Sequence, residues 1–312
     1  MQKGKTMHKG LILGVDGGGS KTIALLADHQ GNVLGRGSGS SSNHLYIGEA
    51  AARHSLMDAI QSAFKAANLP FQMVSAICLG MAGADRPEDC TLIKSWVDEE
   101  KLAHKSSVVN DCILLLWAGT PEGWGIGVVS GTGSIVVGRR RDGQVQRAGG
   151  WGYLIGDEGS GFVVGKAALQ AISHAHDGIG PPTRLTEHIL DHWGLHTPTD
   201  LIHHLYNTDV GVGEIAKLAA FVGIAVKEGD PVAQEILGRA GHDLGRAVVA
   251  VHQKLGFPQE VPTALGGGVL VNNIFLADAL RNVVLDSGLR LSPIKIVHEP
   301  AQGAVRLAIN QL

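Results

Sequence analysis

Apolar residues along this chain come in short runs that end on glycine or on an acidic residue, a pattern that predicts alternating strands and helices. The first run, residues 11–15, ends on Asp16 and three glycines, and a second run follows at 23–27. Short apolar runs bounded by turn residues are typical of strands. We therefore expect a strand, a glycine turn and a second strand, followed by a polar turn and a third strand at 33–37.

Longer segments carry apolar residues every three or four positions, which predicts helices. In chain order, the predicted helices are 47–68, 87–100, 112–118, 162–176, 183–193, 198–206, 213–228, 231–255, 272–286 and 302–309. The strands predicted after the first three are 74–80, 107–110, 125–130, 134–138, 144–148, 261–265 and 294–298.

The opening pattern occurs a second time in the middle of the chain. Residues 125–130 and 134–138 flank another turn of small residues and lead to a third predicted strand, which indicates an internal duplication. Residues 119–123, Gly-Thr-Pro-Glu-Gly, form the clearest break. We therefore predict an N-terminal domain at 1–119 and a C-terminal domain at 120–299 with a helical insertion. The terminal helix, at about 300–312, is expected to pack back on the N-terminal domain.

Composition narrows the class of protein. Of the 312 residues, 44% are hydrophobic and 18% are charged, which predicts globular domains, and a net charge of −3 gives no reason to expect nucleic acid or a membrane as partner. The 44 glycines favour sites lined by backbone. Cys78, Cys90 and Cys112 lack disulfide or metal spacing, and the N-terminal residues lack a signal-peptide core, so we expect a cytoplasmic protein.

The first glycine turn is suited to an anion. Three consecutive glycines let backbone N–H groups converge without Cβ atoms in the way, as a phosphate requires. Ser20 and Thr22 add hydroxyls, and Asp16, at the end of the strand, is suited to holding Mg²⁺ through water. A plain hairpin is the alternative. A second such turn, around Gly131 and Gly133, could face the first across a cleft and hold a polyphosphate from the other side.

Three further acidic residues stand at the ends of predicted elements. Asp111 follows a short strand and precedes a helix, so it is either a functional carboxylate or the cap of that helix. Asp157 and Glu158 precede the helix at 162–176, where capping is again the alternative. A later triple glycine, at 266–268, lets the backbone approach a flat ligand closely.

Together these motifs resemble a known family. In order and spacing, the chain is similar to the N-acetylglucosamine kinase branch of the BadF/BadG/BcrA/BcrD ATPase family, within the sugar kinase/actin/chaperone ATPase superfamily. The resemblance is carried by Asp16-Gly-Gly-Gly-Ser-Lys-Thr22, Ser42-Asn43-His44, Asn110-Asp111, Ser130-Gly-Thr-Gly-Ser134, Gly149-Gly-Trp-Gly152 and Gly156-Asp-Glu-Gly-Ser160. It covers nearly the whole chain. It implies an α/β fold of two actin-like (ribonuclease H-like) domains with a nucleotide and sugar cleft between them.

The resemblance also implies an activity, the ATP- and Mg²⁺-dependent phosphorylation of the 6-hydroxyl of an amino sugar, N-acetylglucosamine first. Asp111 would then be the catalytic base. The sugar would be lined by Asn43, Asp111, Trp151 and Asp157. The ATP phosphates would be held by Gly17, Gly18, Gly19, Ser20, Lys21 and Thr22 and by Ser130, Gly131, Thr132, Gly133 and Ser134, and the adenosine by Gly266, Gly267 and Gly268. A homodimer is the expected assembly.

Several alternatives stay open. A glucosamine kinase would differ at the 2-substituent of the sugar, where the small, neutral Ala148 and Gly161 favour the acetylated sugar; N-acetylmuramic acid is another candidate. A non-kinase ATPase that activates a dehydratase needs cysteines for an iron–sulfur cluster, which three separated cysteines do not suit. Finally, His188 and His192 stand four apart on a predicted helix, a spacing that can share a zinc ion.

Overall fold

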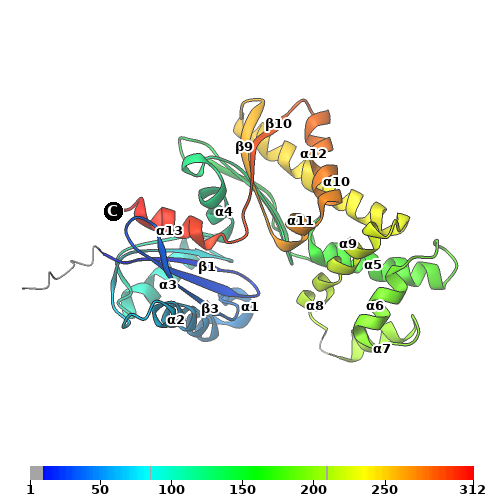
Figure 1. Cartoon of the computed structure of the whole chain (residues 1–312), viewed down its shortest axis with the longest axis horizontal. Coiled ribbons are helices and arrows are strands. Elements are labelled where there is room, and N and C mark those ends of the chain that lie inside the picture. Colours follow the sequence, from blue (N-terminus) through cyan, green and yellow to red (C-terminus); the bar gives the residue numbers. More distant parts are fainter. Residues whose placement is uncertain (1–9, 85, 209) are drawn as a thin grey trace, which may run out of the picture. The chain divides into compact units, whose positions relative to one another are not determined.

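The computed structural model describes residues 10–84, 86–208 and 210–312. The chain divides into two compact units (Figure 1). The first ends at Gly123 and also takes in Glu299–Leu312, while the second is Trp124–His298. Each unit is built on a five-stranded sheet of its own.

The sheet of the first unit has the strand order β3-β2-β1-β4-β5. Its strands are β1 (Ile12–Gly17), β2 (Thr22–Ala27), β3 (Val33–Gly39), β4 (Val74–Met81) and β5 (Ala103–Asn110). β2 is antiparallel to β1 and β3, whereas β1, β4 and β5 are parallel. The carboxyl ends of the parallel strands therefore meet at one edge, where Gly17, Met81 and Asn110 are in register.

Helices cover both faces of this sheet. A core formed with α2 (Glu49–Ala66) and α3 (Pro87–Glu99) lies on one face, and a core formed with α4 (Asp111–Gly119) and α13 (Ala301–Ile309) lies on the other. The short helix α1 (His44–Ile47) precedes α2. Gly14 lets α13 approach β1, because a Cβ there would meet the backbone of Val305. The terminal helix α13 therefore packs on β1 and α4 of the first unit (Figure 1).

The second unit repeats the strand order, as β8-β7-β6-β9-β10. Its strands are β6 (Gly125–Ser130), β7 (Ser134–Arg139), β8 (Val145–Gly149), β9 (Glu260–Gly266) and β10 (Arg290–Ile296). As in the first unit, the first three strands along the chain are antiparallel neighbours and the last two add in parallel. The predicted α/β fold class and internal duplication are confirmed.

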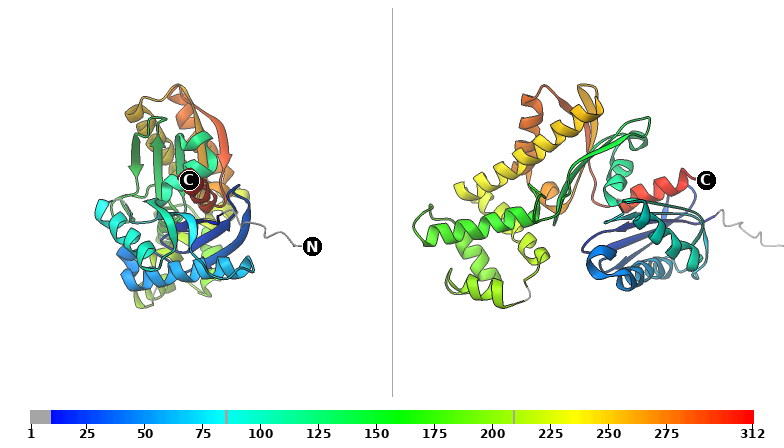
Figure 2. Two further views of the ribbon diagram at one scale, coloured as in Figure 1. Left: turned by 90° about the vertical axis from the view of Figure 1, so that its left-hand side faces the viewer. Right: turned by 180° about the vertical axis from the view of Figure 1, so that it is seen from behind.

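The helices of the second unit form its core with this sheet. The long helix α10 (Pro231–Leu255) packs on β6, β7 and β8 and on α12 (Ile274–Asp286), as Figure 2 shows. The other helices are α5 (Gly161–His176), α6 (Leu185–Trp193), α7 (Asp200–Asn207), α8 (Val212–Lys217), α9 (Ala219–Lys227) and α11 (Gly268–Asn272), and a 3₁₀ turn, Pro121–Gly123, precedes the unit.

One predicted helix is interrupted. The helix predicted at 213–228 is divided at Leu218, whose N–H donates to the carbonyl of Ile215, three residues back. The helix predicted at 272–286 is α12, which begins at Ile274, two residues later than predicted, after Asn273 in an extended backbone conformation with φ −124° and ψ 95°. The short helix α11 before it was not predicted. The last strand begins at Arg290, four residues earlier than predicted, and ends at Ile296. Apolar spacing continues through Leu218, so it could not reveal the break in the helix there.

Candidate active-site residues

Two carboxylates are coupled at the carboxyl end of the parallel strands of the first unit. Asp16 is the penultimate residue of β1, and Asp111 is the first residue of α4, directly after β5. The pKa of Asp16 is raised to about 7, first by burial and then by the negative charge of Asp111, while Lys21 opposes the shift. A divalent cation beside this pair would remove the repulsion, so the pair is suited to a metal bound with phosphate.

Asn110, and not Asp111, caps helix α4. The Asn110 Oδ1 atom accepts the N–H of Cys112 at 3.0 Å. Asp111 occupies the first helical position, where the partial positive charge of the helix favours a carboxylate. The alternative in which Asp111 is the helix cap is therefore wrong.

The first glycine turn is fastened to the segment that follows β3. Thr22 is buried, and its hydroxyl lies 2.7 Å from the carbonyl of Ser40 and 2.8 Å from the hydroxyl of Ser42. The N–H of Ser42 donates to the carbonyl of Gly18 at 3.3 Å. The Thr22 hydroxyl is thus engaged within the protein, and the exposed Ser20 and Lys21 are the side chains of this turn that reach solvent.

The same segment carries Asn43. Asn43 is buried, and its Oδ1 atom caps α1 by accepting the N–H of Leu45 at 3.1 Å. Its Nδ2 group makes no hydrogen bond within the described residues. His44 anchors the segment to α3, because its Nε2 atom lies 3.0 Å from Oδ1 of Asp89 and its ring stands edge-on to Trp96. Asn43 is therefore held firmly with one donor group available.

The second glycine turn is fastened to the stretch before and at the start of α5. The Ser130 hydroxyl donates to the carbonyl of Gly159 at 2.6 Å, and the Ser134 hydroxyl donates to that of Glu158 at 2.7 Å. The backbone adds two bonds, from Gly161 N–H to Gly131 O at 2.7 Å and from Phe162 N–H to Thr132 O at 3.3 Å. Both serine hydroxyls are therefore engaged within the protein, while Thr132 is exposed.

Asp157 joins this turn to the glycine-rich stretch before it. It is buried, and its carboxylate accepts the backbone N–H groups of Ser134 and Gly152, although burial outweighs these bonds and raises its pKa. The cap of α5 is Ser160, whose Oγ accepts the N–H of Val163 at 3.2 Å. Capping by Asp157 or Glu158 is therefore wrong.

The glycines of the two turns differ in how much room a side chain at their position would have. A Cβ at Gly17 would lie 2.5 Å from Met81 Sδ, and one at Gly133 would lie 2.8 Å from Asp157 Oδ2. By contrast, a Cβ at Gly18 would meet only the carbonyl of Lys21 at 3.3 Å. At Gly19 it would meet nothing within 4 Å, and at Gly131 only Gly267 Cα at 3.9 Å. Neither Gly19 nor Gly131 has a positive φ. The space beside these two glycines is therefore open.

The third glycine turn contacts the second. Gly267 has φ +86°, and a Cβ there would meet the backbone of Ser130, whereas Gly268 is exposed and begins α11. Beside this turn lies a pocket of about 320 Å³, walled by apolar side chains of β9, β10, α9, α11 and α12. Lys227, Asn272, Asn273 and Arg281 also line it, and the Nδ2 atoms of the two asparagines donate to the carbonyls of Gly268 and Val269 at 2.8 Å.

Trp151 lies in the loop between β8 and α5. Its side chain is 66% exposed, and the guanidinium of Arg147 lies over its ring, 5.2 Å from the centroid. Tyr153, Leu154 and Ile155 of the same loop are also exposed. The loop therefore presents an apolar surface to solvent.

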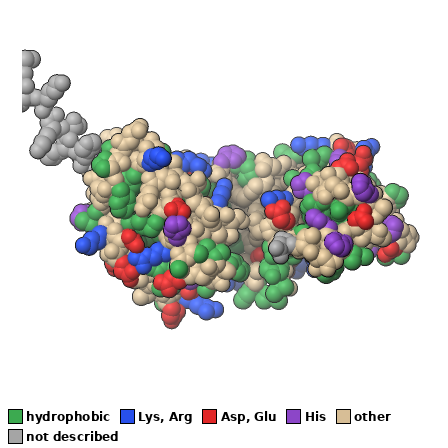
Figure 3. All heavy atoms as spheres, turned by 90° about the horizontal axis from the view of Figure 1, so that it is seen from below, with side chains coloured by type: hydrophobic (Ala, Val, Ile, Leu, Met, Phe, Trp, Pro, Cys, Tyr) green, Lys and Arg blue, Asp and Glu red, His purple; other side chains and the backbone are tan. Residues whose placement is uncertain are grey.

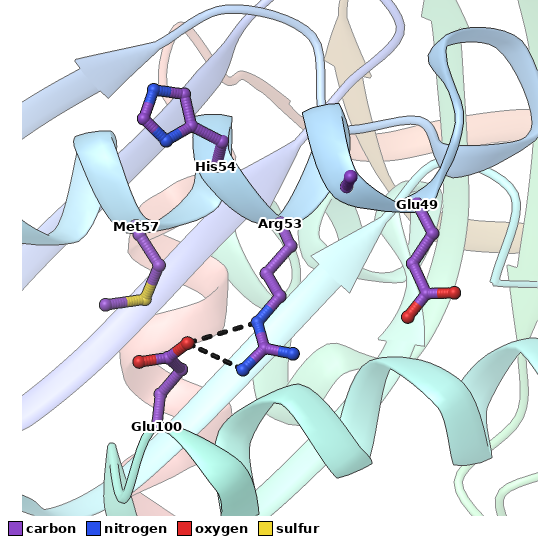
Figure 4. A pocket seen from close by; sticks show the side chains of 6 residues that line it. Glu49, Arg53, His54, Met57 and Glu100 are labelled. Atoms are coloured by element: carbon purple, nitrogen blue, oxygen red, sulfur yellow. Dashed lines mark hydrogen bonds and ion pairs between the residues drawn. The ribbon is translucent and has the colours of Figure 1, made fainter.

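A second pocket, of about 520 Å³, lies on the first unit away from the predicted residues. Figure 4 shows it along α2, with Arg53 pointing at Glu100. The Arg53 guanidinium bonds Glu100 at 2.6 and 3.1 Å and Glu99 at 2.6 Å. Its charges satisfy one another, so the pocket indicates no particular ligand.

Five of the 15 histidines lie within the helical insertion formed by α6–α9, residues 185–227. Figure 3 shows several histidine side chains at the surface there. His188 Nε2 lies 2.9 Å from Glu228 Oε2, whereas the ring of His192 lies against Phe221, with centroids 4.7 Å apart. These residues have different partners, and no group of three or more possible metal ligands occurs among the described residues. Likewise, no helix in the described part of the chain is long and apolar enough to cross a membrane.

Comparisons with known proteins agree with the motifs. The model of the BadF/BadG/BcrA/BcrD ATPase family matches residues 13–308. An N-acetylmuramic acid/N-acetylglucosamine kinase of Clostridium acetobutylicum is 35% identical over 301 residues, 96% of this chain and 98% of that protein. An N-acetyl-D-glucosamine kinase of Dictyostelium discoideum is 32% identical over 318 residues, 97% of this chain and 99% of that protein.

A solved structure from Chromobacterium violaceum, described as a candidate N-acetylglucosamine kinase, superposes with a TM-score of 0.75 and 30% identity. The match covers 96% of this chain and 99% of that one. The extent of the family match and the identity over nearly full length lead to one conclusion: the chain belongs to the BadF/BadG/BcrA/BcrD ATPase family.

Proposed function

We propose that the chain is an ATP-dependent amino sugar kinase that phosphorylates the 6-hydroxyl of N-acetylglucosamine. The observation that carries the proposal is the coupled pair Asp16 and Asp111, in the same unit as a glycine turn with open space beside Gly19. Relatives named as amino sugar kinases supply the substrate class.

Asp111 is the base in this proposal. It accepts the proton of the sugar 6-hydroxyl while that oxygen bonds the γ-phosphorus of ATP and the bond from phosphorus to the β–γ bridging oxygen breaks, releasing ADP. Phosphoryl transfer depends mainly on position and charge neutralisation, so one carboxylate within hydrogen-bond reach of the hydroxyl suffices. Asp16 would hold Mg²⁺ through water, and that ion would neutralise charge on the phosphates.

The phosphates are bound by the two glycine turns around Gly18, Gly19 and Gly131. The N–H groups of Gly18 and Gly131 themselves donate to the carbonyls of Lys21 and Gly133, both at 2.9 Å, so the other backbone N–H groups of the turns serve as donors. The exposed Ser20, Lys21 and Thr132 add side-chain donors. The other predicted residues of these turns act indirectly, because Thr22, Ser130 and Ser134 hold the turns in shape through their own hydrogen bonds. Gly17 and Gly133 leave room for packed neighbours.

The adenosine would be bound beside the third glycine turn. Gly266 and Gly267 bring the backbone close to the second turn, and Gly268 begins the helix at the edge of the turn. The neighbouring pocket of about 320 Å³ offers an apolar wall and amide groups that a purine could use.

The sugar would be bound by Asn43, Trp151 and Asp157. Asn43 offers its Nδ2 group to a ring hydroxyl, and Trp151 offers an aromatic face. Asp157 already accepts two backbone N–H groups, yet an ionised carboxylate has about four acceptor positions and can accept a sugar hydroxyl as well.

The choice among amino sugars rests on few residues. Gly161 is buried, and a Cβ there would meet the carbonyls of Gly131 and Ala216, so its lack of charge does not bear on the 2-substituent. Of the two small, neutral residues, only Ala148 still supports a preference for the acetylated sugar. N-Acetylmuramic acid is the second candidate substrate, because the Clostridium acetobutylicum relative is named for both sugars.

A coupled ADP-release assay with Mg²⁺ across glucose, glucosamine, N-acetylglucosamine and N-acetylmuramic acid tests the proposal. We expect turnover with N-acetylglucosamine and little ATP hydrolysis without sugar. Brisk hydrolysis of ATP that no sugar accelerates would contradict the proposal and favour the non-kinase ATPase. The family resemblance further suggests a homodimer, which light scattering of the purified protein tests.

A further inference from the structure

We propose that Arg147 is a positioning residue for Trp151, holding the indole in the orientation that meets the sugar ring. The inference rests on the proposed function, because it takes Trp151 as part of the sugar site. Arg147 lies on β8, at the end of which the Gly149–Gly152 turn begins.

Arg147 bonds the turn at two points. Its Nη1 atom donates to the carbonyl of Gly149 at 2.9 Å and to the carbonyl of Gly150 at 2.9 Å. Its guanidinium carbon lies 5.2 Å from the centroid of the Trp151 ring. One planar cation therefore fixes the backbone on one side of Trp151 and also contacts its ring.

The turn needs such a clamp. Gly149, Gly150 and Gly152 all have positive φ values, between 70° and 83°, in the left-handed region that glycine adopts readily and leaves readily. Trp151 itself is 66% exposed, so burial does not fix its side chain. Besides Arg147, the turn is held by the Asp157 carboxylate, which accepts the N–H of Gly152, and by backbone bonds, such as Gly150 N–H to Ser134 O at 3.0 Å; these bonds engage the backbone and not the indole.

A positioning role predicts a particular kinetic pattern. Stacking on a tryptophan binds the sugar in the ground state and the transition state alike, so its loss raises KM and spares kcat. Arg147→Gln should therefore raise KM for N-acetylglucosamine about tenfold, with kcat and KM for ATP within about twofold of the wild type. Arg147→Lys, which keeps the charge but lacks the planar fork, should have a KM for the sugar between those of the wild type and Arg147→Gln.

A double-mutant cycle separates this role from others. Because Arg147 is proposed to act through Trp151, Arg147→Gln should have no further effect on KM for the sugar in a Trp151→Ala background. The matched control is Arg141→Gln, which removes a guanidinium 4.4 Å from the centroid of Trp124 in the same unit and should leave KM for the sugar unchanged. Additive effects in the cycle, or a loss restricted to N-acetylmuramic acid, would overturn the inference.

A measurement without substrate keeps this inference separate from the proposed function. The fluorescence of Trp151 is obtained by subtracting the emission of the matching Trp151→Phe variant from that of each protein. Arg147→Gln should make this component more accessible to acrylamide, with an unchanged melting temperature, even if the protein phosphorylates no sugar. Unchanged quenching in both the Gln and the Lys variants would overturn the inference while leaving the kinase proposal intact.

Discussion

The two glycine turns stand at the same place in sheets of the same order, yet only the first carries an acid. In the first unit, Asp16 pairs with Ile23 one step before the turn. In the second unit, Val129 pairs with Ile135 at the equivalent step. The repeated fold thus supplies twice the glycine turn that we propose binds phosphate, and the carboxylates proposed to hold a metal and accept a proton, Asp16 and Asp111, belong to the first unit.

The turns are alike in a second respect. Each is fastened by side-chain hydroxyls to a segment that carries a predicted sugar residue: Thr22 to the segment that leads to Asn43, and Ser134 to the stretch that includes Asp157. Within each unit, a change at the phosphate turn should therefore be felt at the sugar residue. We expect chemistry to depend on the first unit and phosphate binding on both.

The largest effect is expected at Asp111. Asp111→Asn keeps the size of the side chain but cannot accept a proton, so kcat should fall by about 10²-fold or more while ATP affinity stays nearly intact. Steady-state kinetics and calorimetry with ATP measure the two quantities. Asp58→Asn, at an exposed position on α2, is the control and should be normal. Near-normal kcat in Asp111→Asn would move the base elsewhere, with Asp157 the next candidate.

The next largest effect tests whether both turns hold phosphate. Gly131→Ala and Gly19→Ala place a methyl group where the protein has open space, so each should weaken ATP binding about tenfold or more without changing the melting temperature. Gly133→Ala is the contrasting variant, because its Cβ would displace Asp157 and should impair sugar binding as well. Unchanged ATP affinity in a folded Gly131→Ala protein would remove the second turn from the nucleotide site.

A smaller effect separates hydroxyls that hold the turn from those that reach solvent. Thr22→Val leaves the carbonyl of Ser40 and the hydroxyl of Ser42 without a buried partner, which should cost about 1–3 kcal/mol in the free energy of unfolding. Ser20→Ala should leave unfolding unchanged and weaken ATP binding. Denaturant titration measures the free energy of unfolding, and calorimetry measures the affinity for ATP. A loss of stability in Ser20→Ala, together with weaker ATP binding but unchanged stability in Thr22→Val, would contradict the distinction.

The smallest expected effect is a change in how stability depends on pH through the titration of Asp16. The raised pKa of Asp16 means that the folded protein binds its proton more tightly than the unfolded chain does. This contribution to stability is full below the unfolded pKa, near 3.8, and is lost as the pH rises towards about 7. Asp16→Asn should remove that dependence, and Asp111→Asn should lower the pKa of Asp16 seen by carbon NMR. A pKa of Asp16 unaffected by Asp111→Asn would show that the two carboxylates are not coupled.

Strands and turns were predictable because apolar runs and glycines mark them directly. The strand 125–130 and the helix 231–255 agree with β6 and α10 at both ends. The break at Leu218 was not, because it lies within continuous apolar spacing. Capping was also ambiguous: Asn110 and Asp111 are both good caps by residue type, and only the backbone geometry distinguishes them.

Residue types at the site were predictable, but their partners were not. The Thr22 hydroxyl turns to Ser42 and the Ser130 hydroxyl to the carbonyl of Gly159, contacts across 20 and 29 residues that no local pattern signals. Arg147 was missed for a similar reason. An arginine on a strand usually projects away from the sheet into solvent, and here its side chain returns to the turn that follows.

Identification of the product tests the central claim most directly. Wild-type protein is incubated with Mg²⁺, ATP and N-acetylglucosamine, and the phosphorylated sugar is analysed by phosphorus–proton correlation NMR. The account predicts one phosphomonoester, on the oxygen of carbon 6, formed in step with ADP and absent with Asp111→Asn. ADP released without any phosphorylated sugar, or a phosphate on another hydroxyl, would contradict it.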